Sequence, residues 1–108
     1  MNLVILPDNP QVVTKLLTIG QLAVELHKAK RAAALAKTAY RDALQEYEEE
    51  HGKQPGRLDP RDEIHAGIII HTKATFGAYR TAKRQVYNAQ RHLDAAIRKL
   101  ARLAEVAA

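Results

Sequence analysis

Apolar residues recur with helical spacing in two long segments of this chain. In the first segment, Val12, Leu16, Ile19, Ala23 and Leu26 follow one another at steps of four and three residues. Side chains three and four residues apart share one face of an α-helix. The second segment carries a comparable stripe, formed by Ile69, Phe76, Tyr79, Ala82, Val86, Leu93, Ile97, Leu100 and Ala104. The pattern predicts an all-α fold of two long amphipathic helices, with an alanine-rich seam that suits a tight coiled coil.

Two Asn/Asp-Pro steps indicate where these helices begin. Asn9 can cap a helix whose first residue is Pro10, and Asp59 stands before Pro60 in the same way. The segment between them is short, so the helices are expected to form an antiparallel hairpin. The predicted organisation is an extended N-terminal segment (1–9) and a helical hairpin (10–108), with helix 1 at about 10–50, a loop at 51–59 and helix 2 at about 60–106.

Both segments hold more apolar residues than a single neighbouring helix can cover. Around Val12–Leu26 the apolar arc widens to roughly 200°, whereas one antiparallel neighbour covers perhaps 120°. Ile68, Ile69 and Ile70 point in three directions. Because exposed apolar surface of this kind usually marks an interaction site, we expect self-association into a helical bundle. The expected oligomer interface comprises Val12, Leu16, Ile19, Leu22, Leu26, Ile68, Ile69 and Phe76.

Charge is distributed unevenly along a chain of net charge +5. From Asp42 to Glu63, eight acidic and three basic residues give −5, and the rest of the chain carries +10. Glu48, Glu49 and Glu50 fall at the predicted end of helix 1, where the helix dipole disfavours negative charge. They form either a solvated cap or an acidic tip that docks on a basic surface. We use "acidic tip" below for these three glutamates.

A series of arginines in the second segment keeps a near-helical spacing. The sequence pI of about 9.7 permits contact with nucleic acid. No helix-turn-helix, zinc finger or basic leucine zipper accompanies these residues, so any such binding is expected to be non-specific. A solvated face and a surface for an acidic protein are the alternatives. This predicted basic ridge comprises Arg80, Arg84, Arg91, Arg98 and Arg102.

The residue inventory argues against catalysis. The chain contains neither serine nor cysteine, and nothing resembles a glycine-rich phosphate-binding loop. Glu48-x-x-His51 and Asp62-x-x-His65 flank the predicted loop, but a di-metal centre needs further glutamates that project into a buried site. We therefore predict no enzymatic activity, no metal and no cofactor.

These observations favour a non-catalytic assembly or adaptor protein. It would act through homo-oligomerisation and protein–protein contacts, and its small size and high content of alanine and arginine suit a phage-encoded structural or host-interfering role. A non-specific nucleic-acid-binding oligomer is the alternative. The N-terminus has no signal-peptide pattern and no segment has the length and hydropathy of a membrane span. We therefore expect a cytoplasmic or virion-associated protein without a membrane partner.

Overall fold

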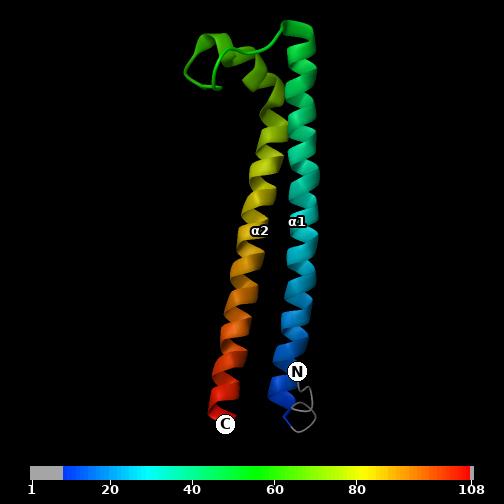
Figure 1. Cartoon of the computed structure of the whole chain (residues 1–108), viewed down its shortest axis with the longest axis vertical. Helices are drawn as coiled ribbons and strands as arrows, with labels where there is room; N and C mark the ends of the chain where they lie inside the picture. The colour runs from blue at the N-terminus through cyan, green and yellow to red at the C-terminus, as the bar shows by residue number, and fades with distance from the viewer. Residues whose placement is uncertain (1–8, 108) are drawn as a thin grey trace. The chain divides into compact units, whose positions relative to one another are not determined.

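The structure, a computed structural model, describes residues 9–107 of the 108-residue chain. Two helices of 42 residues each, α1 (Pro10–His51) and α2 (Ala66–Ala107), are separated by the short 3-10 helix η1 (Glu63–His65). Figure 1 shows these elements, and no strand occurs in the described part of the chain. The all-α, two-helix hairpin expected from the apolar spacing is thus confirmed. The predicted extended segment lies outside the described residues, except for Asn9.

Asn9 caps α1 as its sequence context predicts. Its Oδ1 atom accepts hydrogen bonds from the backbone N–H groups of Gln11 at 3.0 Å and Val12 at 3.4 Å. Its carbonyl oxygen accepts the N–H of Val13 at 3.1 Å. Pro10 occupies the first helical position, where a missing N–H is not needed. Local capping chemistry therefore determines where α1 begins.

The second helix begins six residues later than the sequence predicts, at Ala66 rather than Pro60. Asp59 does accept the N–H of Arg61 at 2.9 Å, but its carbonyl also accepts the N–H of Asp62 at 3.0 Å, which closes a turn. Asp62 then takes an extended conformation (φ −93°, ψ 122°) and caps η1 by accepting the N–H of Ile64 at 3.1 Å. The aspartate that starts the helical run is therefore Asp62.

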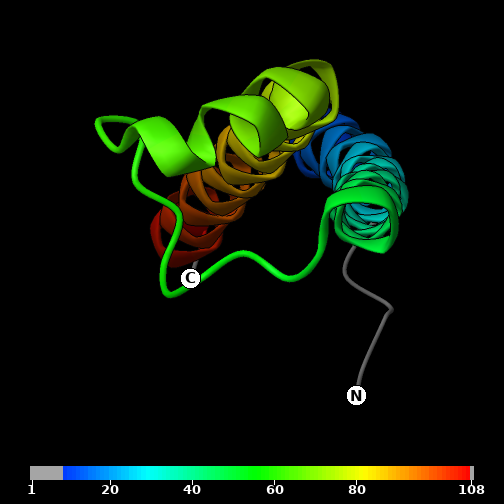
Figure 2. The ribbon, with the colours of Figure 1, turned by 90° about the horizontal axis from the view of Figure 1, so that it is seen from above.

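Glycine ends the first helix. Gly52 has φ 83° and donates its N–H to the Glu48 carbonyl at 2.8 Å, so the left-handed residue follows directly after His51. His51, predicted in the loop, is the last residue of α1. Gly56 has φ 64°, a conformation that side chains with a Cβ rarely adopt. We call residues 52–65, between α1 and α2, the connection. Figure 2 shows it, in green, leaving α1 and returning through η1 into α2.

The chain divides into two compact units, each containing segments of both helices. Unit 1 combines Met1–Ala29 with Gln85–Ala108, and unit 2 is Lys30–Arg84, which includes the whole connection. The structure describes 9–29 and 85–107 of unit 1. In each unit a segment of α1 packs beside a segment of α2.

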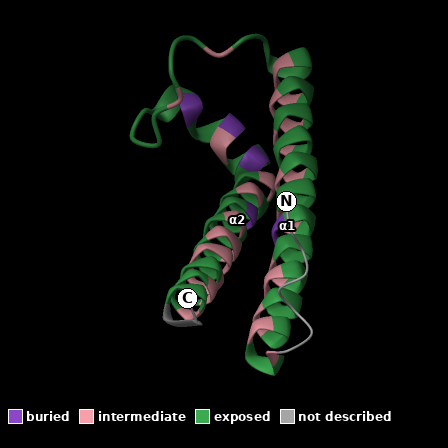
Figure 3. Ribbon diagram, turned by 60° about the horizontal axis from the view of Figure 1, so that its bottom comes forward, coloured by how far each residue is buried: buried purple, intermediate pink, exposed green. Residues whose placement is uncertain are grey.

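Covered positions recur at alternating steps of three and four residues along each helix, the heptad spacing of coiled coils. We call the two sets of positions the seam, and Figure 3 shows them as an intermediate and buried stripe on each helix. The seam of α1 comprises Val12, Lys15, Ile19, Leu22, Leu26, Ala29, Ala33, Ala36, Tyr40, Ala43 and Tyr47. The seam of α2 comprises Ile68, Thr72, Thr75, Tyr79, Ala82, Val86, Ala89, Leu93, Ala96, Leu100 and Leu103.

The core built along this seam is small. Among the described residues, Leu26, Ile68 and Ala82 are the buried hydrophobic side chains, and Ile68 is the one that is fully enclosed. Thr72 is buried beside it and donates its hydroxyl to the Ile68 carbonyl at 2.8 Å. Alanine and threonine supply little apolar area, so two helices alone bury a modest hydrophobic surface.

Two glycines of α2 are expected to respond oppositely to alanine. A Cβ on Gly77 meets nothing within 4 Å, so Gly77→Ala should raise the free energy of unfolding by about 0.5–1 kcal/mol through helix propensity. A Cβ on Gly67 would overlap the Tyr47 hydroxyl and lie 3.1 Å from its Cζ atom, so Gly67→Ala should cost about 1–3 kcal/mol. Urea denaturation of both variants at one protein concentration measures this. Equal stabilisation would show that α1 and α2 do not approach closely at Gly67.

Candidate functional site

Most of the predicted interface residues lie between the two helices of the chain itself. Val12, Ile19 and Leu22 are half-buried on the seam of α1, and Leu26 is buried there. Ile68 is fully enclosed in unit 2. These five side chains therefore stabilise the hairpin. The other three, Leu16, Ile69 and Phe76, retain exposed surface outside the seam.

A second apolar stripe runs along the opposite face of α1 in unit 1. It consists of Val13, Leu17, Gly20 and Val24, which follow one another at steps of four, three and four residues. Leu17 is 65% exposed and Val24 is 53% exposed. A Cβ built on Gly20 meets nothing within 4 Å. The stripe has the spacing of a helix-packing surface, but no element of the described chain covers it. We call it the outer stripe.

Unit 2 exposes further large apolar side chains. Leu35 on α1, Ile64 in η1 and Ile70 on α2 are 70%, 60% and 75% exposed. Among Ile68, Ile69 and Ile70, whose side chains point in different directions, only Ile68 is fully buried. Within the predicted surplus at Ile68–Ile70, Ile70 is therefore the exposed residue, and Ile69 is half-buried.

The acidic tip forms the last turn of α1. Glu48 is half-buried, whereas Glu49 and Glu50 are exposed. Glu49 accepts a hydrogen bond from the Gln45 side chain at 3.1 Å, and Glu50 lies 3.6 Å from the His51 imidazole. No lysine or arginine of the described chain lies within 4.0 Å of these carboxylates. At this helix C-terminus, where a cation would be favourable, none of the three glutamates therefore pairs with a lysine or an arginine.

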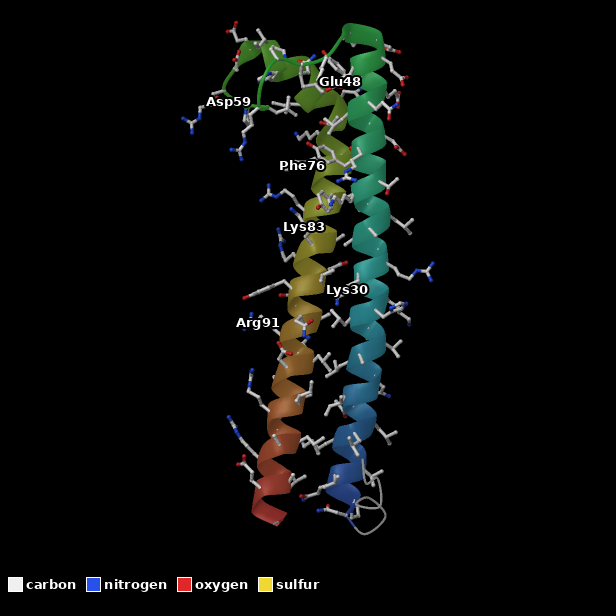
Figure 4. All side chains as sticks on the ribbon, in the orientation of Figure 1. Lys30, Glu48, Asp59, Phe76, Lys83 and Arg91 are labelled. Carbon is white, nitrogen blue, oxygen red and sulfur yellow. The ribbon has the colours of Figure 1, made fainter. Side chains whose placement is uncertain are left out.

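The predicted basic ridge lies on the exposed side of α2. Arg84, Arg91 and Arg98 are seven residues apart, opposite the seam, and Arg80 and Arg102 flank this row. Figure 4 shows Lys83 and Arg91 directed away from α1. The described ion pairs within 4.0 Å are Lys28–Glu25, His51–Glu50 and His71–Glu46, and none involves an arginine. With eight basic and two acidic residues, α2 carries a net charge of +6.

Aromatic rings hold some of these cations in place. The Arg80 guanidinium lies 5.8 Å from the Phe76 ring centroid, the Lys83 ammonium 4.5 Å from that of Tyr79, and Arg91 5.7 Å from that of Tyr87. Each pair is spaced by four residues on α2. Cation–π contacts at exposed sites contribute about 0.5–1 kcal/mol. They orient the side chains without neutralising their charge.

His65 organises the connection and is not positioned as a catalytic base or a metal ligand. It is buried, its Nδ1 atom accepts the Asp59 N–H at 3.0 Å, and its Nε2 atom lies 2.9 Å from the Pro55 carbonyl. A carbonyl can only accept, so Nε2 is the donor and the ring is the neutral Nε2–H tautomer. Both ring nitrogens are thus used to join the loop to η1. The His51 ring, at the end of α1, lies with its centroid 4.4 Å from that of Tyr47, and the two rings are tilted by 31°.

A surface pocket of about 500 Å³ opens within unit 2. Its walls combine aromatic and aliphatic side chains with two cations, and its lining consists of Tyr40, Arg57, Leu58, Pro60, Ile69, Thr72, Lys73 and Phe76. The rings of Tyr40 and Phe76 are 5.2 Å apart at 44°, and Tyr40 also stacks 6.2 Å from Tyr79. Sequence reasoning missed this pocket. The one available signal was an apolar residue, Leu58, between charged residues of a polar loop.

The described residues include neither a cluster of possible metal ligands nor a membrane-spanning helix. No three His, Asp or Glu side chains of residues 9–107 gather into a possible metal site. Neither α1 nor α2 contains a stretch long and apolar enough to cross a bilayer.

In comparisons with known proteins, no family model, no curated protein and no solved structure matches the chain.

Proposed function

We propose that this protein is a non-catalytic assembly protein that acts through self-association of its helical hairpin. The observation that carries the proposal is the contrast between a very small core and large uncovered apolar side chains. Only Leu26, Ile68 and Ala82 are buried hydrophobic residues in the described chain, whereas Leu17, Val24 and others stand in solvent. Contiguous exposed apolar surface usually marks an interaction site.

The outer stripe favours a second copy of the chain as the partner in unit 1. Its steps of three and four residues match those of the seam, so another helix can pack against it by the same geometry. Gly20 is unfavourable in a helix by about 1 kcal/mol relative to alanine, and no atom of the described residues lies within 4 Å of a Cβ built on it. Close approach of a helix from another copy would account for a glycine at this position.

Sedimentation velocity of the whole chain tests the proposal. At micromolar concentration the protein should sediment as a multiple of its 12.0 kDa chain mass, and its thermal midpoint should rise with concentration, because association stabilises the folded chain. A well-folded species of one chain mass across that range would contradict it.

The acidic tip fits this proposal as a determinant of register. No lysine or arginine of the described chain lies within 4.0 Å of its glutamates, and α2 carries a charge of +6. Pairs between the tip of one copy and α2 of another would contribute about 0–1 kcal/mol each. Such pairs orient the copies, while apolar surface supplies the affinity.

Non-specific nucleic-acid binding is the second candidate function, and the unpaired arginines of α2 favour it. Arg84, Arg91 and Arg98 repeat every seven residues on the exposed side of the helix and have no carboxylate within 4.0 Å in the described chain. Such a row can follow phosphates. Three cations already lie against rings of their own helix, so the surface offers charge rather than stacking for bases.

Binding of this kind should be independent of sequence and sensitive to salt. A plot of log affinity against log salt concentration has a negative slope, and each phosphate contact contributes about −0.9 to it. We therefore expect replacement of Arg84, Arg91 and Arg98 by glutamine to make this slope less negative by roughly 2–3. Fluorescence anisotropy with a random duplex measures the slope. A matched control replaces Lys28, Lys30 and Lys37 of α1 by glutamine. Binding that is equally impaired in the control, or that survives about 0.2 M salt with sequence selectivity, would refute this assignment.

A further inference from the structure

We propose that the pocket of unit 2 binds a small aromatic carboxylate. The inference concerns residues of unit 2 alone and does not depend on self-association. The pocket volume of about 500 Å³ lies within the range of small-molecule sites, about 300–1,000 Å³. Such sites are typically apolar, with a few polar groups that fix the orientation of the ligand.

The apolar wall is suited to a flat ring. Tyr40 of α1 and Phe76 of α2 meet at 44° with centroids 5.2 Å apart, and Phe76 remains 42% exposed. A third ring can therefore stack on or meet the edge of this pair, an arrangement that aromatic groups favour. Leu58 and Pro60 from the connection, together with Ile69 from α2, provide an aliphatic wall. The label of Phe76 in Figure 4 marks this region of α2.

The charged residues that line the pocket indicate that the polar group of the ligand is an anion. Arg57 and Lys73 are its two cations, and no acidic residue lines the pocket. Neither cation has a carboxylate within 4.0 Å in the part of the chain that the structure describes. The hydroxyl of Thr72 is already donated to the Ile68 carbonyl. An anion bound beside the rings would supply the partner that both cations lack, and a guanidinium pairs well with a carboxylate.

The connection gives this pocket its shape. Arg57, Leu58 and Pro60 belong to the loop, and the loop is attached to η1 by the two hydrogen bonds of the buried His65. These bonds reach the carbonyl of Pro55 and the N–H of Asp59, on either side of Arg57 and Leu58. The cation and the aliphatic wall of the loop are thus positioned against α2 before any ligand binds. Preorganisation lowers the entropic cost of binding.

Titration of the isotopically labelled whole chain with 2-naphthoate, followed by amide chemical shifts, tests the proposal. We expect a dissociation constant on the order of 0.1–1 mM for a ligand of this size. Shift changes should cluster at residues 57–60 and 69–76. The uncharged 2-naphthamide should bind several-fold more weakly, and octanoate should bind more weakly than the aromatic acid.

Matched variants locate the site. Arg57→Gln and Lys73→Gln should each weaken 2-naphthoate binding about two- to five-fold, as expected for exposed charge pairs, whereas Arg61→Gln, outside the lining, should not. Ile69→Ala should weaken binding, and Ile70→Ala, next to it but outside the pocket, should have no effect. The assignment would be overturned if the chemical-shift changes were dispersed over the chain or if 2-naphthamide bound as tightly as 2-naphthoate. It would also be overturned if the Arg57→Gln and Lys73→Gln variants kept the affinity of the unmodified chain for 2-naphthoate. If octanoate binds as tightly as 2-naphthoate or more tightly, the pocket does not prefer an aromatic ligand, and that part of the proposal is wrong.

Discussion

Replacement of Ile68 by alanine is expected to lower the free energy of unfolding by about 2–5 kcal/mol. Ile68 is 0% exposed and is the one fully enclosed side chain among the described residues. Its neighbours include the buried Thr72 hydroxyl, which donates to the Ile68 carbonyl. Truncation would leave a cavity at the start of α2. Because the rest of the core is small, this loss is a large fraction of the stability that a domain of this size can have.

Ile70 offers the matched control, two residues away on the same helix. It is 75% exposed, so Ile70→Ala should change the unfolding free energy by less than about 0.5 kcal/mol within one hairpin. Urea denaturation at a fixed and low protein concentration separates the two variants, because association would otherwise add to the apparent stability. A similar loss in both variants would show that Ile68 does not anchor unit 2.

If the chain self-associates as proposed, replacement of Leu17 and Val24 by glutamate is expected to dissociate the copies while the helices remain folded. Both side chains are more than half exposed within the chain, so glutamate there meets only solvent in a single hairpin. At an interface between copies, each buried carboxylate would cost several kcal/mol. Sedimentation should then give the 12.0 kDa species, and far-ultraviolet circular dichroism should show that helix content is retained.

A second pair of substitutions adds the same charge on a different face of α1. Gln11→Glu and Thr18→Glu lie seven residues apart, away from the outer stripe, at exposed positions. This variant should sediment like the unmodified chain. Dissociation in both variants would implicate net charge rather than the outer stripe. Retained association in the Leu17/Val24 variant would show that the copies meet elsewhere, for example through Leu35 and Ile70.

Local chemistry in the sequence was sufficient to predict the helices themselves. The apolar periodicity predicted two long helices, and Asn9-Pro10 predicted the start of α1 because an Asn cap and a first-turn Pro act within a few residues. The end of α1 was predicted to within one residue, where Gly52 adopts a positive φ. The exposed arginine row of α2 likewise followed from spacing alone.

Tertiary structure decided which apolar residues are covered and where α2 starts. The sequence stripe placed Leu16 and Ala23 on the packing face of α1, whereas the structure covers Lys15 and Leu22. Either choice keeps steps of three and four residues, and only the presence of the second helix distinguishes them. Asp59 and Asp62 both carry capping groups, and the His65 bonds to Asp59 and Pro55 retain 59–62 in a turn. The pocket arises because this turn brings Arg57 and Leu58 against α2, a contact between residues distant in sequence that no local pattern encodes.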